Sequence, residues 1–537
     1  MLHGILIKNG MLVDGTGAPA APMDLVIDGT KIAGIHKRGE AVGLMSIEAK
    51  GKIVCPGFID IHSHSDLHLL ANPLAESKIM QGVTTELVGN CGSSAAPIMG
   101  TARTVTEDYA EELCVNVDWT TIDEYLLRLN NLRTSVNVCT LVGAETVRRS
   151  VLGDDDVRPT GETLDRMRGL VAEGMIQGAF GISSGLIYAP GCYATTDELI
   201  ALASTAASFG GIYASHIRGE GRTLVKAVAE AIEIGRESHA KVEISHHKAC
   251  GPENWGKVKD TINMIIQARA EGVDVAFDVY PYTASCTSLD SILPPWVREG
   301  GKEAVISRLK DPQMRARIIK ELETPSDDWE AMAAETDWDN ITLINFKNAE
   351  NKKFENKSVL RIARATGKKP AELALDMICD EKLRVFAVFH EMNEDDVVRV
   401  ISNPLSVIGS DGCAEKPYGP GSDSAVHPRA YGTFPRVLRR YAIDLPALSI
   451  EEAVRKMTSM PAERIGLEDR GVLAKGMAAD VVVFDPSRVR DLASFENSHA
   501  YPEGIEQVLV NGDLTVENSK HTRERNGLVL RHKPAIV

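Results

Sequence analysis

The sequence predicts an α/β protein centred on a (β/α)8 TIM-like barrel, with a small β-sandwich domain formed from both termini and an insertion after the seventh strand. Through the middle of the chain, apolar runs of strand length alternate with amphipathic runs, which is typical of parallel strands joined by crossover helices. Both ends consist of short apolar runs separated by turns, and the interval 287–375 interrupts the alternation. A doubly wound open sheet is the competing fold, but it gives no reason for so many strands to end in histidine or acid.

The two ends of the chain are predicted to form one small β domain from residues 1–54 and 465–537. Near the N-terminus, apolar runs are punctuated by Asn-Gly and Asp-Gly, which favour tight turns between strands. The C-terminal end returns to the same style. The runs assigned as strands are 4–10, 24–35, 479–485 and 505–512.

Residues 55–464 are predicted to form the barrel. Helical runs such as 161–178 and 224–240 lie between most of its strands. The active site of such a barrel is built from the C-terminal ends of the strands. The eight predicted strands are 53–64, 84–90, 136–143, 179–185, 211–217, 241–247, 273–280 and 405–411.

The segment 287–375 is predicted to be inserted after the seventh strand. It opens with Leu293-Pro294-Pro295-Trp296 and then becomes helical and charged. An insertion at this point is either a lid over the active site or a solvated surface excursion, and the sequence leaves both open.

Composition places the chain among ordinary globular proteins, with 44% hydrophobic and 25% charged residues. The net charge of -16 argues against nucleic acid and anionic membranes as partners, because both favour basic surfaces. The start has no signal-peptide pattern, and no run approaches the ~18 apolar residues that span a bilayer. The nine cysteines show no paired spacing, so we expect a cytoplasmic protein without a disulfide framework.

Groups that can bind a metal lie at five predicted strand ends. Side chains alternate along a strand, so the two histidines of the first strand point the same way. Alone, each group is usually structural, but their occurrence at the same end of barrel strands indicates a metal site. Imidazole, thiolate and carboxylate suit zinc. These residues are His62, His64, Cys91, His216, His246 and Asp411.

Several motifs occur along nearly the whole chain in the order found in one family. They are His62-Ser63-His64-Ser65-Asp66, Gly89-Asn90-Cys91-Gly92, Ser183-Ser184-Gly185-Leu186-Ile187-Tyr188-Ala189-Pro190-Gly191, Ser215-His216-Ile217-Arg218, Ser245-His246-His247-Lys248, Asp278-Val279-Tyr280-Pro281-Tyr282, Gly409-Ser410-Asp411-Gly412 and His427-Pro428-Arg429-Ala430-Tyr431-Gly432-Thr433-Phe434. In these motifs the chain resembles the N-acyl-D-amino-acid deacylases (D-aminoacylases) of the amidohydrolase superfamily. The resemblance implies zinc-dependent hydrolysis of a linear amide, with a small-molecule N-acyl-D-amino acid as substrate.

The resemblance also implies a ligand set. Many members of the superfamily bridge two metals with a carboxylated lysine on the fourth strand, where this chain has Ser183 and Ser184. Cys91 is then expected to replace that lysine. One tight Zn²⁺ is expected at Cys91, His216 and His246. A second, weaker position would use His62, His64 and Asp411, with Cys91 as a possible bridge.

The remaining roles are also drawn from the matched motifs. Asp411 is expected to accept a proton from water and to deliver it to the leaving amine. Tyr188 is expected to donate a hydrogen bond to the developing oxyanion. The candidates for binding the substrate carboxylate are Lys248, Tyr282 and Arg429.

The chain departs from the family where relatives often have a Gly-His-x-x-x-Arg run, because it has Ala144 in place of the histidine, followed by Glu145. His68 and His427 lie near the motifs and are expected to have structural or rim roles. A cyclic-amide hydrolase of the hydantoinase or dihydroorotase type, and an inactive binding protein, are the alternative functions. The side-chain preference of the substrate and the oligomeric state are not readable from the sequence.

Overall fold

A computed structural model describes residues 3–419 and 422–533, and its centre is formed by parallel strands in chain order. Three strands form one parallel sheet: β7 (Phe58–Asp60), β8 (Val83–Val88) and β9 (Asn137–Thr140). Six form the next: β10 (Val142–Gly143), β11 (Gly181–Gly185), β12 (Ile212–His216), β13 (Lys241–Ile244), β14 (Val275–Val279) and β19 (Ser406–Ile408). Only Leu141 separates β9, the last strand of the first sheet, from β10, the first strand of the second. The second sheet therefore continues the first.

The ends of the first and last central strands lie side by side. Ser63, beyond β7, forms a parallel bridge with Gly412, beyond β19. The Asp411 amide donates to the His62 carbonyl at 2.8 Å, and the His64 amide donates to the Gly412 carbonyl at 3.1 Å. The fold therefore brings two predicted ligand segments together although about 350 residues of sequence separate them.

The predicted strand 53–64 is two strands. β6 (Ile53–Pro56) pairs with β20 (Val481–Phe484) in a terminal sheet, whereas β7 pairs with β8 in the central one. The break falls at Gly57, where a Cβ would lie 2.2 Å from the Thr84 hydroxyl oxygen and no side chain fits. The apolar run is continuous in sequence because both strands are buried, although they belong to different sheets.

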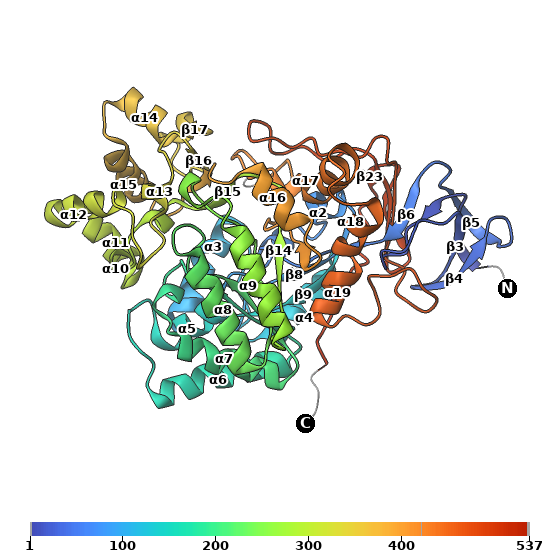
Figure 1. Cartoon of the computed structure of the whole chain (residues 1–537), viewed down its shortest axis with the longest axis horizontal. Coiled ribbons are helices and arrows are strands. Elements are labelled where there is room, and N and C mark those ends of the chain that lie inside the picture. The colour runs from blue at the N-terminus through green and yellow to red at the C-terminus, as the bar shows by residue number, and fades with distance from the viewer. Residues whose placement is uncertain (1–2, 420–421, 534–537) are drawn as a thin grey trace.

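Amphipathic helices cover the central strands (Figure 1). In α8, the side chains of Leu224, Val228, Ala231 and Ile232 are buried, at the spacing of one helix face. These side chains belong to the same apolar cluster as the strand residues Val242 and Phe277. The helices outside the insertion are α1 (His68–Ala71), α2 (Glu76–Ile79), α3 (Gly100–Glu112), α4 (Ile122–Leu132), α5 (Ala144–Leu152), α6 (Gly161–Ile176), α7 (Thr196–Ser208), α8 (Leu224–Ser238), α9 (Val258–Ala270), α16 (Glu394–Ile401), α17 (Arg429–Arg436), α18 (Ile450–Met457) and α19 (Ser459–Ile465).

Strands from both termini form two further sheets, seen at the right of Figure 1. One has the order β4 (Lys31–Lys37), β3 (Met23–Asp28), β1 (His3–Lys8), β5 (Gly43–Glu48). The other has the order β2 (Met11–Leu12), β6, β20, β21 (Ile505–Val510), β22 (Asp513–Glu517), β23 (Lys520–His521). Leu25, Val54 and Val481 share one apolar cluster, which joins the two sheets. The chain then returns to the centre, where Val529 bridges Val138.

The segment after β14 forms a body with its own apolar cluster, at the upper left of Figure 1. Its sheet has the order β15 (Ser285–Ser288), β18 (Phe386–Phe389), β16 (Ile341–Ile344), β17 (Lys357–Ser358). Its helices are α10 (Pro295–Arg298), α11 (Gly301–Lys310), α12 (Pro312–Leu322), α13 (Met332–Glu335), α14 (Val359–Thr366) and α15 (Pro370–Asp380). This sheet extends beyond the predicted 287–375 on both sides.

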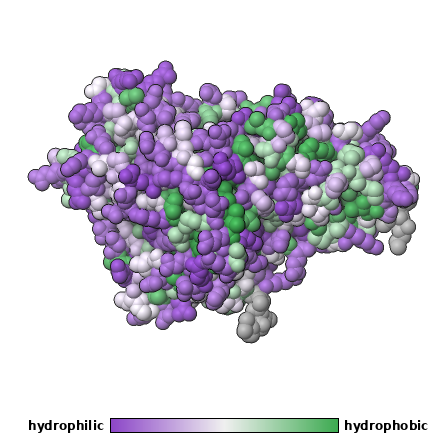
Figure 2. Space-filling model, in the orientation of Figure 1, coloured by the Kyte–Doolittle hydropathy of each residue, from purple (hydrophilic) through white to green (hydrophobic). Residues whose placement is uncertain are grey.

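The face shown in Figure 2 is mostly hydrophilic, with apolar residues gathered in patches toward the right of the view. Among residues 3–419 and 422–533, no helix combines the length and the apolar character needed to cross a membrane.

Candidate metal centre

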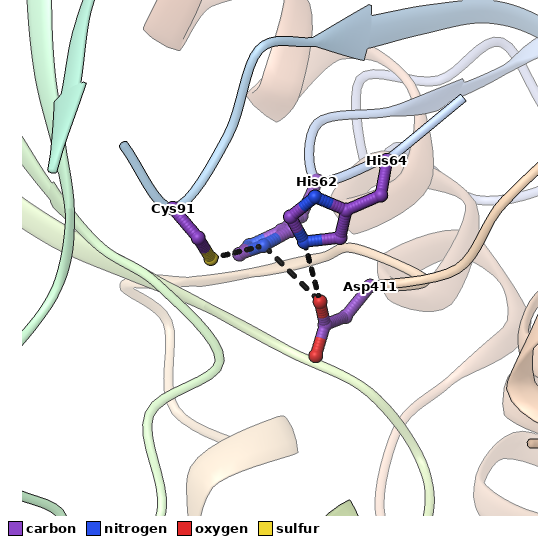
Figure 3. A group of neighbouring side chains, drawn as sticks. All are labelled: His62, His64, Cys91 and Asp411. Atoms are coloured by element: carbon purple, nitrogen blue, oxygen red, sulfur yellow. Dashed lines mark hydrogen bonds and ion pairs between the residues drawn. The ribbon is translucent and has the colours of Figure 1, made fainter. Parts of the chain in front are cut away.

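Four predicted ligands converge at the ends of β7, β8 and β19 (Figure 3). His62 Nε2 lies 3.2 Å from Cys91 Sγ. Asp411 Oδ1 lies 3.0 Å from His64 Nε2 and 3.4 Å from His62 Nε2. All four candidate ligand atoms lie within 4.8 Å of one another, so one ion could contact them all after small movements.

A second group shares Cys91 and adds His216 and His246, whose candidate ligand atoms also lie within 4.8 Å. Cys91 Sγ lies 3.5 Å from His246 Nε2, and the centroids of the His216 and His246 rings are 4.4 Å apart. Both ring nitrogens of His216 are buried without a hydrogen-bond partner among the described residues. Such an imidazole is costly unless a partner occupies the space beside it, and the thiolate–imidazole donor set fits zinc.

Three of the candidate ligands have strained backbones. Cys91, His246 and Asp411 have φ values of 49°, 37° and 51°, in the left-handed region that side chains other than glycine rarely adopt. Each lies just beyond a central strand, where the chain turns sharply into a loop. Strain of this kind, maintained by the surrounding packing, is characteristic of functional sites.

The charges at the site favour the ligand forms of Cys91 and Asp411. Burial acts to raise the pKa of the Cys91 thiol, but His62 and His246 lower it well below its usual value. Burial also acts to raise the pKa of Asp411, but Arg429 and His62 hold it well below the ordinary range. The thiolate and the carboxylate are the forms that bind metals.

Two acids that the sequence analysis did not assign to the site orient the histidines. Asp278 Oδ2 lies 3.0 Å from His62 Nδ1, and its Oδ1 accepts from the His246 amide at 2.8 Å. Glu220 Oε1 lies 2.9 Å from His246 Nδ1. Carboxylates in this position fix the ring orientation of metal-binding histidines. The Asp278 motif was visible in the sequence, but nothing in its spacing showed which histidine it would contact.

A cavity of about 530 Å³ opens over these residues, and most of the predicted substrate-contacting side chains line it. Lys248 Nζ lies 2.6 Å from Glu220 Oε1. Arg429 Nη1 lies 2.8 Å from Asp411 Oδ2. The Tyr188 hydroxyl oxygen accepts a hydrogen bond from Thr287 at 3.0 Å, and its ring lies 5.0 Å from that of His216.

Tyr282 is placed differently from the sequence expectation. Its hydroxyl is directed toward the Pro428 carbonyl at 3.4 Å, its ring packs under Arg436, and it does not line this cavity. Tyr280 lines the cavity instead, with a buried hydroxyl that has no hydrogen-bond partner among the described residues. Both tyrosines follow β14, and the turn after that strand decides which of them faces the metal residues.

Ala144 and Glu145, which depart from the family pattern, lie where α5 begins, and Glu145 lines the cavity. Glu145 Oε1 accepts from the Gly185 amide at 2.9 Å, and Oε2 is buried without a partner among the described residues. Burial raises the pKa of Glu145 to about 7. Ala144 is itself buried and brings no polar group to the site.

Comparisons with known proteins agree with this architecture. The model of the amidohydrolase family matches residues 46–516. The D-aminoacylase of Alcaligenes xylosoxydans xylosoxydans is 35% identical over 533 residues, which cover 99% of this chain and 98% of that protein. The structure of N-acyl-D-glutamate deacylase from Bordetella bronchiseptica, complexed with zinc and a phosphonate inhibitor that mimics the tetrahedral intermediate, has a TM-score of 0.82 at 33% identity. It covers 99% of this chain and 100% of that chain.

A D-aminoacylase structure that addresses the functional role of the binuclear metal center also has a TM-score of 0.82, at 32% identity. The match covers 98% of this chain and 100% of that chain. These matches extend over the terminal strands, the central strands and the insertion. The chain therefore belongs to the amidohydrolase family, in the group that contains the D-aminoacylases and N-acyl-D-amino-acid deacylases.

Proposed function

We propose that this protein hydrolyses the amide bond of N-acyl-D-amino acids in a zinc-dependent reaction, releasing a carboxylate such as acetate and the free D-amino acid. The observation that carries the proposal is the position of Cys91, which belongs to two groups of metal-competent side chains in one cavity. The full-length similarity to deacylases of this substrate class supports the same activity.

Cys91, His216 and His246 are proposed to hold a tight Zn²⁺. The unpartnered nitrogens of His216 support this assignment. His62, His64 and Asp411 are proposed to form a second, weaker position, with Cys91 as the bridge. Zinc supplies Lewis acidity in such a site, which acidifies water and polarises the amide carbonyl.

The side chains around the metal residues are proposed to move the proton and to stabilise charge. Asp411 accepts a proton from water and returns it to the leaving amine. Its low pKa keeps it ionised before the reaction. Because Thr287 donates to the Tyr188 oxygen, the Tyr188 proton remains available for the oxyanion of the substrate.

Lys248 and Arg429 are proposed to bind the α-carboxylate of the substrate, and Tyr280 takes the place first expected for Tyr282. Arg429 already lies against a carboxylate, that of Asp411. An incoming substrate carboxylate competes for the same guanidinium, which can present two parallel N–H donors.

With β9 and β10 counted as the one predicted strand 136–143, the eight central strands are proposed to close into a (β/α)8 barrel of residues 55–464, with residues 1–54 and 465–537 as the β-sandwich domain. The bridge from Ser63 to Gly412 supports closure. The segment 287–375 is proposed as a lid, because Met332 and Ile344 from this part of the chain line the cavity.

Matched substrates test this function. The purified enzyme is assayed with N-acetyl-D- and N-acetyl-L-amino acids, and with hydantoins and dihydroorotate, before and after zinc removal by a chelator. We expect turnover of the D-series only, loss of activity without zinc and recovery on its return. Turnover of cyclic amides alone would assign the alternative enzyme, and absence of both turnover and bound zinc would indicate an inactive binding protein.

A further inference from the structure

A third group of metal-competent side chains lies on the wall of the same cavity and shares no residue with the Cys91 groups. It consists of His68, where α1 begins, and of Cys413 and Glu415, which follow β19. One candidate ligand atom from each residue lies within 4.8 Å of the others. All three residues line the cavity, so an ion can reach them from solvent.

We propose that His68, Cys413 and Glu415 form an additional metal site, separate from the Cys91 centre, which takes Zn²⁺ or a similar borderline cation. An imidazole, a thiolate and a carboxylate are the three ligand types that zinc uses in proteins. With three protein ligands, a fourth position remains open toward the cavity, as in sites that exchange their metal or bind a further ligand.

The distance between His68 and Glu415 suits two ligands of one ion better than a hydrogen bond between the two side chains. His68 Nε2 lies 3.7 Å from Glu415 Oε1, which is too long for a hydrogen bond. An imidazole nitrogen and a carboxylate oxygen on one tetrahedral zinc are separated by roughly 3.3 Å, given the usual bond lengths. Only a small contraction would therefore bring both atoms onto one ion.

His68 is nearly buried, with 9% of its surface exposed, and its Nδ1 has no hydrogen-bond partner among the described residues. Because Nε2 is the nitrogen that faces Glu415, the ion would be bound through Nε2, and Nδ1 would need a partner of its own. Burial lowers the pKa of His68, which favours the neutral ring that binds metals. Burial and Glu415 raise the pKa of the Cys413 thiol, so binding of the ion must displace the thiol proton.

The site would connect two loops that carry the reaction machinery. His68 lies four residues after His64, and Cys413 lies two residues after Asp411. The Cys413 thiol donates to the His64 carbonyl at 3.3 Å. When Cys413 binds the ion, this contact is replaced by a sulfur–metal bond, and the thiol proton passes to solvent. The ion would then tie the loop after the first central strand to the loop after the last.

Zinc stoichiometry tests the proposal directly. Full-length protein is dialysed against increasing ZnCl₂, and bound zinc per chain is measured by atomic emission. We expect Cys413→Ala and His68→Gln each to bind one equivalent fewer than the unmodified protein at saturation. Cys114→Ala is the control, because Cys114 is exposed and lies outside the cavity. Equal stoichiometry in all four proteins would overturn the proposal.

Alkylation of Cys413 distinguishes this site from zinc bound at the Cys91 centre. The rate of carbamidomethylation is followed on the Cys413 peptide by mass spectrometry, with and without ZnCl₂. We expect zinc to slow the reaction at least about tenfold in the unmodified protein, because a metal-bound sulfur is a poor nucleophile, and to have little effect in His68→Gln. Protection that persists fully in His68→Gln, or a rate that zinc does not change in either protein, would contradict the proposal.

Discussion

At the scale of residues, the centre depends on side chains whose surroundings suit them to one task. Cys91 combines burial, a left-handed backbone and two neighbouring imidazoles that stabilise its thiolate. Its sulfur lies between His62 and His246. A single thiolate is therefore placed to serve both proposed metal positions.

The two metal positions should respond differently to ligand loss. Cys91→Ala removes a donor from both groups, whereas His62→Ala removes one from the weaker group only. In a His68→Gln background, which removes the additional site proposed above, we expect the purified Cys91 variant to retain less than about a tenth of the zinc of its parent, and the His62 variant to retain most of one equivalent. Atomic absorption after gel filtration measures this. Equal zinc loss in both variants would contradict the assignment of the tight site.

Asp411 should matter for turnover far more than for tight metal binding. Asp411→Asn preserves the shape of the side chain but removes the proton acceptor, so kcat should fall by about 10²–10⁴-fold. Zinc content should remain near one equivalent, because Cys91, His216 and His246 are unchanged. Activity within about threefold of the unmodified enzyme would exclude the proton-transfer role.

Arg429 should select for a substrate carboxylate. Arg429→Met should lower kcat/KM for an N-acetyl-D-amino acid by at least about 10²-fold, through loss of a charge-assisted contact. The loss should be much smaller for the amide of the same substrate, which lacks the carboxylate. Arg439→Met, at a half-exposed arginine paired with Asp444, is the control. Equal losses on both substrates would indicate a structural role.

At the scale of elements, the site depends on how the strand ends are joined. Lys78 in α2 is fully buried, and its Nζ lies 2.7 Å from both Asp60 Oδ2 and the Ser410 hydroxyl oxygen. It also donates to the Gly412 carbonyl at 2.9 Å. One ammonium group therefore joins β7, α2 and the loop after β19, close in sequence to the candidate ligands His62 and Asp411.

Removal of this ammonium group should destabilise the protein strongly. Lys78→Met leaves the carboxylates of Asp60 and Glu86 buried without their cation, a change that typically costs about 3–5 kcal/mol. Urea unfolding followed by circular dichroism measures the free energy of unfolding. Lys226→Met, at an exposed position of α8, should change it by less than about 0.5 kcal/mol. Similar free energies of unfolding for both variants would show that the contacts of Lys78 contribute little to stability.

At the scale of the whole molecule, the last part of the chain closes the side of the strands opposite the metal residues. The Leu530 amide donates to the Val138 carbonyl at 2.9 Å, and the Gly527 amide donates to the Thr134 carbonyl at 2.8 Å. Thr134 and Val138 lie near the start of β9, far along the strand from the loops that carry the ligands. The C-terminal segment therefore contributes to stability rather than to chemistry.

Gly527 tests this contribution, because a Cβ there would lie 2.0 Å from the Val136 carbonyl oxygen. Gly527→Ala must push the C-terminal segment away from β9, which should cost about 1–3 kcal/mol. Gly161→Ala is the matched control, because no atom lies within 4 Å of the added Cβ. Thermal unfolding should show a lower midpoint for the first variant only. Kinetic constants of the folded protein should be unchanged in both.

Much of this architecture was readable from local sequence. The strands of the centre are long apolar runs in regular alternation with helices, and the ligand residues stand at their ends. The sequence could not show that 53–64 divides between two sheets at Gly57, because burial gives both parts the same apolar pattern. It also could not place Tyr280 and Tyr282, since the turn after β14 does not follow the strand alternation.

The sequence by itself determined the chemistry that is available: a cysteine, histidines and an aspartate at strand ends, in motifs that identify the family. The tertiary structure decided which of these groups meet. His62 and Asp411 are adjacent only because the first and last central strands come together. Asp278 in β14 and Glu220 in the loop after β12 contact histidines that belong to other strands. Such contacts depend on strand register and loop geometry, which arise from packing of the whole chain and leave no local pattern in the sequence.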